Sequence, residues 1–192
     1  MPPKAKFTKE EIIRAAISIV ERGGIAALTA RSLGNALESS SRPIFTVFSG
    51  MNEVNEAVLA YARSVYADYV NSGLNEQKAF RGVGKAYIRF AAERPRLFQL
   101  LFMRENEELP DQNSILVGIE EHYRAILRSI TEEYGVDETA AKSLYFHIWV
   151  YSHGLAVLLA TRMCAFTADE ITKNITEVFR SLVKTVKTEG KL

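Results

Sequence analysis

The chain has 192 residues, of which 47% are hydrophobic, so it is long enough to form one or two domains with a buried core. A single cysteine, Cys164, excludes an intrachain disulfide framework and suits a reducing compartment. The formal net charge is +1, yet residues 1–50 hold seven basic and four acidic side chains, an excess that favours a polyanionic partner at this end.

The first predicted helix covers residues 8–22. Thr8 and Glu11 have the spacing of a reciprocal capping box, and Gly23-Gly24 ends the helix. Ahead of it the sequence shows no signal peptide, so we expect a cytoplasmic protein. Its apolar residues repeat every three or four positions and predict one buried stripe of Ile12, Ala16, Ile19 and Val20.

Residues 29–54 have the pattern of a helix-turn-helix. Thr29 is a suitable N-cap for the first helix, and residues 38–41 form a polar turn. Pro43 then opens a second helix that begins at Arg42 or Pro43, because proline is tolerated in the first turn. The expected buried stripe of the first helix is Leu33, Ala36 and Leu37.

The second helix is predicted to be short and to have two different faces. Ile44 and Phe48 lie four residues apart and point inward. An outer face with an arginine, hydroxyl groups and an aromatic ring is what a reader of the DNA major groove needs, although an ordinary helical hairpin stays the alternative. This outer face contains Arg42, Phe45, Thr46 and Ser49.

The residue types in this region indicate separate roles on double-stranded DNA. Arg42 can pair bidentately with guanine or contact a phosphate. Phe45 can touch a thymine methyl group or pack in the core. Lys4 and Lys6 can form an arm that follows the DNA backbone. Further candidates, expected to contact phosphates more than bases, are Thr29, Ser40, Ser41 and Thr46.

Beyond residue 50 the sequence predicts only helices, which gives an all-α fold of about nine helices. The residues at 105–112 form a loop, and Thr167 with Glu170 forms a second capping box that opens the last helix. Cys164 has apolar surroundings typical of a buried, inert thiol. The other predicted helices cover residues 52–70, 76–93, 95–103, 114–134 and 138–164.

Residues 144–160 form an almost continuous apolar run with no formal charge. The run is at the short end of the length needed to cross a bilayer. A helix that is apolar on every side also suits the centre of a soluble bundle or a dimer interface. We expect the second arrangement and no membrane partner.

These features resemble the tetracycline-repressor (TetR) family of transcriptional regulators. The resemblance implies an all-α homodimer in which residues 1–50 bind DNA, while residues 51–192 bind a small inducer and dimerise through the last two helices. The residues that carry it are Leu28-Thr29, Arg31, Leu33, Ala36-Leu37, Pro43-Ile44-Phe45 and Phe48, with Phe98 and a Trp149…His153-Gly154 pattern farther along.

Four positions depart from the family pattern. Glu38 occupies the turn position that usually holds glycine, and Phe45 replaces the commoner tyrosine. Val47 and Met51 stand where histidine and lysine are frequent. Each change removes a typical contact with the DNA backbone, so the resemblance implies a weaker or an unusual operator complex.

Aromatic residues on several predicted helices are candidates to line an inducer cavity. Taken singly, each is more typical of plain core, and a histidine among them is more often a hydrogen-bonded core residue. We expect a largely apolar or aromatic inducer, oriented by the two histidines. The candidates are Tyr61, Tyr87, Phe90, Phe98, Phe102, His122, Tyr123, Tyr145, Trp149 and His153.

A metal or catalytic site has little support. His147 and His153 are six residues apart, about 120° around a helix, so they do not form a chelating pair. We therefore expect no metal, no cofactor and no enzymatic activity. The sequence predicts a ligand-responsive repressor on a palindromic operator. The alternatives are a helical-bundle enzyme or carrier with a non-DNA-binding N-terminal hairpin, and a regulator that answers to a protein partner.

Overall fold

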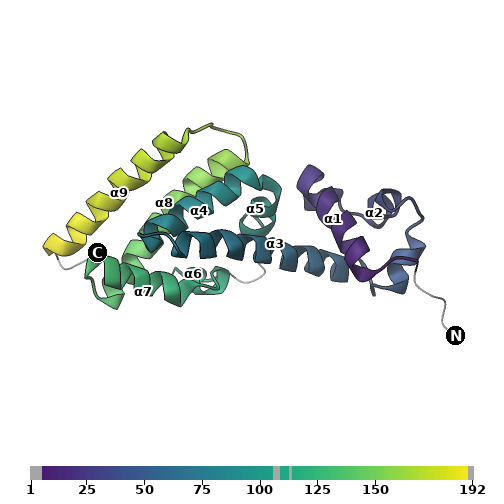
Figure 1. Ribbon diagram of the computed structural model, residues 1–192, viewed down its shortest axis with the longest axis horizontal. Coiled ribbons are helices and arrows are strands. Elements are labelled where there is room, and N and C mark those ends of the chain that lie inside the picture. Colours follow the sequence, from purple (N-terminus) through teal and green to yellow (C-terminus); the bar gives the residue numbers. More distant parts are fainter. Residues whose placement is uncertain (1–5, 106–108, 113, 190–192) are drawn as a thin grey trace. The chain divides into compact units, whose positions relative to one another are not determined.

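The computed structural model describes residues 6–105, 109–112 and 114–189. Over these residues it contains nine α-helices, two short 3-10 helices and no strands, which confirms the expected all-α fold (Figure 1). The elements are α1 Lys9–Gly23, η1 Ile25–Ala27, α2 Ala30–Ala36, η2 Arg42–Thr46, α3 Met51–Leu74, α4 Ala79–Glu93, α5 Pro95–Phe102, α6 Ile115–Ile119, α7 Tyr123–Tyr134, α8 Glu138–Ala160 and α9 Ala168–Glu189.

The chain forms two compact units that share α3. The first unit contains Met1–Val65 and Arg94–Arg104, and the second contains Tyr66–Glu93 and Glu105–Leu192. The boundary therefore falls inside α3, which continues through it without a break. The functional division into residues 1–50 and 51–192 stays a prediction.

The first unit is built around α1. Ile12, Ala16, Ile19 and Val20 are all buried, as predicted. The predicted capping box is also confirmed, because the Thr8 hydroxyl accepts from the Glu11 amide at 3.2 Å and the Glu11 carboxylate accepts from the Thr8 amide at 2.8 Å. The buried stripe of α1 packs against α2, η1 and α5. The amphipathic period of the sequence thus places this helix correctly.

The first helix of the helix-turn-helix begins as predicted, but its expected buried stripe is only partly buried. Thr29 caps α2, and its hydroxyl accepts from the Ser32 amide at 3.1 Å. Leu33 is fully buried, but Ala36 is exposed, so the predicted stripe is wrong at that position. Gly34 is buried instead, because the backbone of Ser40 lies 3.0 Å from the place of a β-carbon there. The returning chain therefore packs on Gly34.

The predicted helix at residues 114–134 is wrong, because it is divided into α6 and α7. Glu120 has an extended backbone at the end of α6, and its side chain is buried. The Glu120 carboxylate accepts hydrogen bonds from the Tyr66 hydroxyl at 2.7 Å and from the His122 amide at 3.0 Å. A buried carboxylate needs such partners, so the helix opens to supply one of them.

The segment after α8 also corrects two expectations. The helix ends at Ala160 and not at Cys164, and Arg162 has a left-handed backbone with a φ of 59°. Cys164 is exposed, so the expected buried thiol is wrong. The capping box of the last helix is confirmed, because the Glu170 carboxylate accepts from the Thr167 amide at 2.8 Å and the Thr167 hydroxyl accepts from the Glu170 amide at 3.2 Å.

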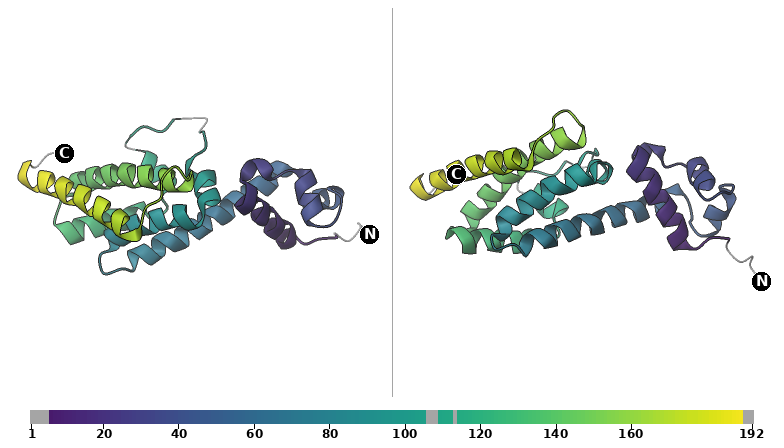
Figure 2. Two further views of the ribbon diagram at one scale, coloured as in Figure 1. Left: turned by 90° about the horizontal axis from the view of Figure 1, so that it is seen from above. Right: turned by 45° about the horizontal axis from the view of Figure 1, so that its top comes forward.

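The second unit is a helical bundle in which α8 occupies the middle. α8 packs against α4, α7 and α9, and both views in Figure 2 show α9 running beside it. Among the described residues, α8 is the one helix long and apolar enough to cross a membrane by length and composition, and 39% of its most apolar stretch is buried. The rest of that stretch is half-buried or exposed.

The hairpin between α3 and α4 depends on two glycines in close contact. A β-carbon on Gly73 would lie 2.6 Å from the backbone of Gly82, and one on Gly82 would meet the Gly73 carbonyl oxygen even more closely. Gly84, one half-turn farther along α4, has open space at the same position. A side chain at Gly82 would therefore overlap neighbouring backbone, whereas one at Gly84 would begin in open space.

We expect Gly82→Ala to lower the free energy of unfolding by about 1–3 kcal/mol, because the new methyl group overlaps backbone that cannot move aside. Gly84→Ala is the matched control and should raise it by about 0.5–1 kcal/mol, since alanine favours helix and nothing obstructs it. Urea unfolding followed by circular dichroism measures both. Equal stabilities of the two variants would contradict the close contact.

Candidate nucleic-acid interface and ligand cavity

The second helix of the helix-turn-helix is η2, a 3-10 helix of five residues with Pro43 in its first turn. Ile44 and Phe48 are 0% and 1% exposed, so both anchor η2 in the core of the first unit. Phe45 is 44% exposed, and Arg42 is exposed as well. The predicted inner and outer faces are thus both observed, although the DNA contacts themselves stay predictions.

Hydroxyl groups on the outer face are held by local hydrogen bonds. Thr46 donates to the Pro43 carbonyl oxygen at 2.7 Å, which leaves the lone pairs of its hydroxyl to accept. Ser49 uses its amide and its hydroxyl, at 2.8 Å and 3.1 Å, to donate to the Glu53 carboxylate. Both hydroxyls therefore keep their lone pairs to accept a hydrogen bond from a ligand.

Glu53 is a positioning residue that sequence reasoning missed. It lies in the first turn of α3. Its carboxylate forms an ion pair with the Lys9 ammonium group at 3.0 Å and also accepts from the Ser49 amide. The hydrogen bond from the Ser49 backbone, followed by the one from Lys9, lowers the pKa of Glu53 below its ordinary value. The sequence signal for this role was a glutamate in the first turn of a helix, four residues after Ser49, where such a side chain can accept from the preceding backbone.

Other predicted DNA contacts surround the turn between α2 and η2. Thr29 and Ser40 are exposed, and Ser41 is half-buried. The Lys6 ammonium group donates to the Ser39 hydroxyl at 3.0 Å, so this side chain lies at the turn, while Lys4 lies outside the described residues.

Glu38 takes a left-handed backbone at the turn. Its φ is 49°, a conformation that costs a residue with a β-carbon about 1–2 kcal/mol and that glycine adopts freely. The departure from the family pattern noted at this position is therefore a real steric cost. It also adds a negative charge beside the expected DNA contacts.

The predicted ligand residues are divided between the two units. Tyr61, Phe98 and Phe102 belong to the first unit, where the ring centroids of the two phenylalanines are 5.2 Å apart. The other seven belong to the second unit. Tyr87, Tyr145 and Trp149 line a space of only about 20 Å³, enough for one water molecule. The rings around it are packed as core in this structure.

Two of the remaining candidates pack against the same rings. Phe90 is fully buried, with its ring centroid 5.4 Å from that of Tyr66. Tyr123 stacks on Tyr145, with centroids 5.8 Å apart and planes inclined by 26°. Both side chains therefore contribute to the aromatic core of the second unit.

His153 shares a hydrogen-bonded cluster with Tyr87 and Trp149. The Tyr87 hydroxyl lies 2.8 Å from Nδ1 of His153, and the Trp149 ring stacks on the histidine at 5.1 Å between centroids. Burial lowers the pKa of His153 below its ordinary value of 6.5, so the ring is neutral at pH 7. Burial raises the pKa of Tyr87 far above its usual range, and a hydrogen bond from Trp149 offsets part of the rise.

His122 belongs to a different cluster, next to Glu120. Its Nδ1 atom is 3.4 Å from the Glu120 carboxylate. The same carboxylate accepts a hydrogen bond from the Tyr66 hydroxyl. Burial first, and then the charge of Glu120, raises the pKa of Tyr66 well above its usual range. His122 and His153 therefore serve separate clusters. Among the residues that the structure describes, no group of three His, Cys, Asp or Glu side chains could hold a metal ion.

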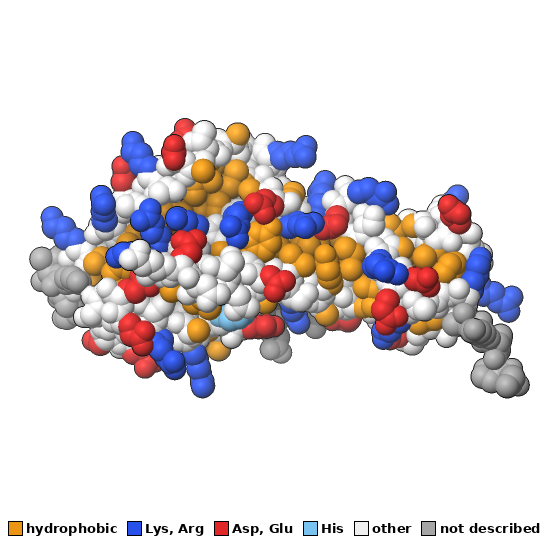
Figure 3. All heavy atoms as spheres, viewed as in Figure 1, with side chains coloured by type: hydrophobic (Ala, Val, Ile, Leu, Met, Phe, Trp, Pro, Cys, Tyr) orange, Lys and Arg blue, Asp and Glu red, His pale blue; other side chains and the backbone are white. Residues whose placement is uncertain are grey.

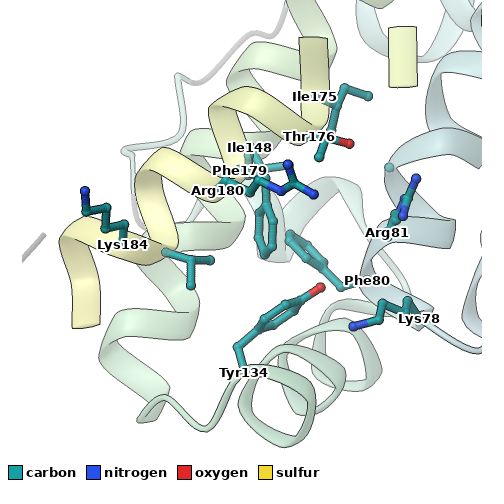
Figure 4. Close-up of a pocket in the computed structure, with 12 residues that line it drawn as sticks. Lys78, Phe80, Arg81, Tyr134, Ile148, Ile175, Thr176, Phe179, Arg180 and Lys184 are labelled. Carbon is teal, nitrogen blue, oxygen red and sulfur yellow. The ribbon is translucent and has the colours of Figure 1, made fainter. Parts of the chain in front are cut away.

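A much larger cavity, of about 530 Å³, lies among α4, α7, α8 and α9 (Figure 4). Its volume is in the range of small-molecule sites in proteins. Sequence reasoning predicted none of its lining residues. They are Lys78, Phe80, Arg81, Gly84, Tyr134, Ile148, Ile175, Thr176, Phe179, Arg180, Val183 and Lys184.

The comparisons with known proteins concern the second unit above all. Residues 80–186, from α4 to near the end of α9, match a family model described as a tetracyclin repressor-like C-terminal domain. No curated protein matches the chain. The matched range includes the complete lining of the large cavity except Lys78.

We expect the stability of the protein to fall as the pH is lowered from 7.5 to 5. His153 has a lowered pKa in the folded state, so it binds a proton more readily after unfolding; its contribution is fully present above about pH 6.5 and is lost below it. His153→Gln should reduce this fall. Urea unfolding at each pH tests this, and an unaltered fall in His153→Gln would contradict it.

Proposed function

Because the chain belongs to the family of tetracycline repressor-like regulators, we propose that it is a transcriptional repressor. It binds a palindromic operator as a homodimer and leaves the DNA when a small molecule occupies its C-terminal domain. The observation that carries this proposal is the pairing of that domain with a helix-turn-helix whose η2 exposes Arg42 and Phe45 above two buried anchors.

The exposed face of η2 suits the major groove. Arg42 presents a planar guanidinium group for guanine, and Phe45 offers an apolar edge for a thymine methyl group. Thr46 retains acceptor capacity, and Lys6 beside the turn supplies a positive charge for a phosphate. These groups combine base contacts with backbone contacts, as specific readers of DNA require.

Dimerisation through α8 and α9 supports the geometry of a palindrome. α8 has apolar residues on its outer face. Val150 is 48% exposed there, and no atom lies within 4 Å of the place of a β-carbon on Gly154. Burial of this face against a second copy removes it from water and allows close approach of the helices. Two copies then place their η2 segments in successive major grooves, about 34–36 Å apart.

Release by an inducer needs a connection between the two units, and α3 provides it. Its last residues, from Tyr66 onward, belong to the second unit, and its first turn holds η2 through Glu53 and Ser49. A ligand that moves the end of α3 therefore acts on the recognition segment through one continuous helix. A protein of this kind works in the cytoplasm, with α8 packed inside the bundle and not in a membrane.

We expect Arg42→Ala to weaken binding to the operator about 10- to 100-fold and to relax the preference at one base pair, because a bidentate pair with guanine is lost. Fluorescence anisotropy with the DNA that flanks the chain's own gene measures this at several salt concentrations. Arg128→Ala, an exposed arginine of the second unit, is the control and should bind normally. Unchanged affinity of Arg42→Ala would contradict the role of η2.

We expect Val150→Arg to weaken dimerisation at least about tenfold, since it places two unpaired charges in an apolar interface. Light scattering coupled to size exclusion measures the mass at decreasing concentration. Val117→Arg is the matched control, because Val117 is 57% exposed and lies on α6, outside the proposed interface. A Val150→Arg protein that stays dimeric like the control would rule out α8 as the contact.

A further inference from the structure

The large cavity of the second unit has an apolar interior formed by aromatic rings from three helices. The Phe179 ring of α9 lies 5.7 Å from Phe80 of α4 and 4.8 Å from Tyr134 of α7, measured between ring centroids. Figure 4 shows these rings gathered between the helices, with Ile148 of α8 behind them. Such a surface binds the apolar body of a small molecule.

The edge of the same cavity is strongly cationic. Four of the twelve lining residues are Lys or Arg, and none is Asp or Glu. Within the described parts of the chain, Lys78, Arg81 and Arg180 form no ion pair. In Figure 4 the guanidinium groups of Arg81 and Arg180 come from α4 and α9 toward the same end of the cavity. Figure 3 shows a hydrophobic hollow beside α9 with Lys and Arg side chains along its edge.

A carboxylate next to this cavity, Glu133, already has a hydrogen-bond partner. Glu133 accepts from the Phe80 amide at 3.3 Å and therefore stabilises the start of α4. Burial first, then the charge of Glu133, raises the pKa of Tyr134 to about 12, so its hydroxyl is neutral at pH 7. The lining itself contains no Asp or Glu, so a bound anion would lessen the repulsion among its four cations.

We propose that this cavity binds an organic acid, with its carboxylate between Arg81 and Arg180 and its apolar body against Phe80 and Phe179. Its identification as the inducer site rests on the proposed function, whereas the binding of the acid does not. A carboxylate bridging the two arginines would join α4 to α9, a helix of the proposed dimer interface. Occupancy would thereby alter the arrangement of the helices that set the spacing of the recognition segments.

The test is isothermal titration calorimetry on the full chain, without DNA. The probes are decanoate and 2-naphthoate, which distinguish an alkyl from an aromatic body, each compared with the uncharged alcohol of the same skeleton. We expect at least one acid to bind once per chain, and its alcohol to bind at least about tenfold more weakly, since the alcohol lacks the charge-assisted hydrogen bonds.

Three variants locate the site. Arg81→Gln and Arg180→Gln should each weaken the acid about tenfold or more, and Lys173→Gln, an exposed cation of α9 outside the lining, should not. Gly84→Leu should abolish binding by filling the cavity. A β-carbon at Gly84 meets nothing within 4 Å, and circular dichroism verifies that the variant folds.

The inference is overturned if neither acid produces heat, if the alcohols bind as tightly as the acids, or if Arg81→Gln and Arg180→Gln bind like Lys173→Gln. Operator binding is measured separately, without acid. Absence of operator binding would defeat the proposed function and leave the acid site intact. Operator affinity that saturating acid does not change would overturn the identification of this cavity as the inducer site.

Discussion

The burial of Ile44 and Phe48 is the constraint on which the proposed DNA interface depends. η2 has five residues and too few backbone hydrogen bonds to persist alone, so tertiary packing must hold it. Because Ile44 and Phe48 are buried, the other side of the segment faces solvent, and Arg42 and Phe45 are exposed there. Glu53 then fixes the following turn by accepting from Ser49. The outer face is thus a consequence of the inner one.

Local signals in the sequence predicted local structure well. The capping boxes at Thr8 and Thr167 depend on residues three positions away, and both form as predicted. The break at Glu120 could not be predicted this way, because it depends on Tyr66, which is 54 residues distant. Without that partner, Glu120 and its neighbour Glu121 look alike, as two charges on the outside of a continuous helix.

The same limit explains why the large cavity was missed. Aromatic residues at helical spacing have the same period whether they fill a core or line a cavity, and Tyr87 and Tyr145 turned out to be packed. Arg81 and Arg180 have the spacing of ordinary solvated charges, so nothing in the sequence distinguishes them from Lys173. Only the packing of α9 beside α4 and α8 brings them to one cavity.

The apolar character of α8 has two origins that the structure separates. One side of the helix is covered by α4, α7 and α9, which accounts for buried residues such as Leu144 and Ile148. The other side carries Val150 and Gly154, which no part of the second unit needs for its own core. Exposing such a face to water is unfavourable, and the proposed second copy would bury it. Since α9 lines the cavity and belongs to the proposed dimer interface, ligand binding and dimer geometry would depend on one helix.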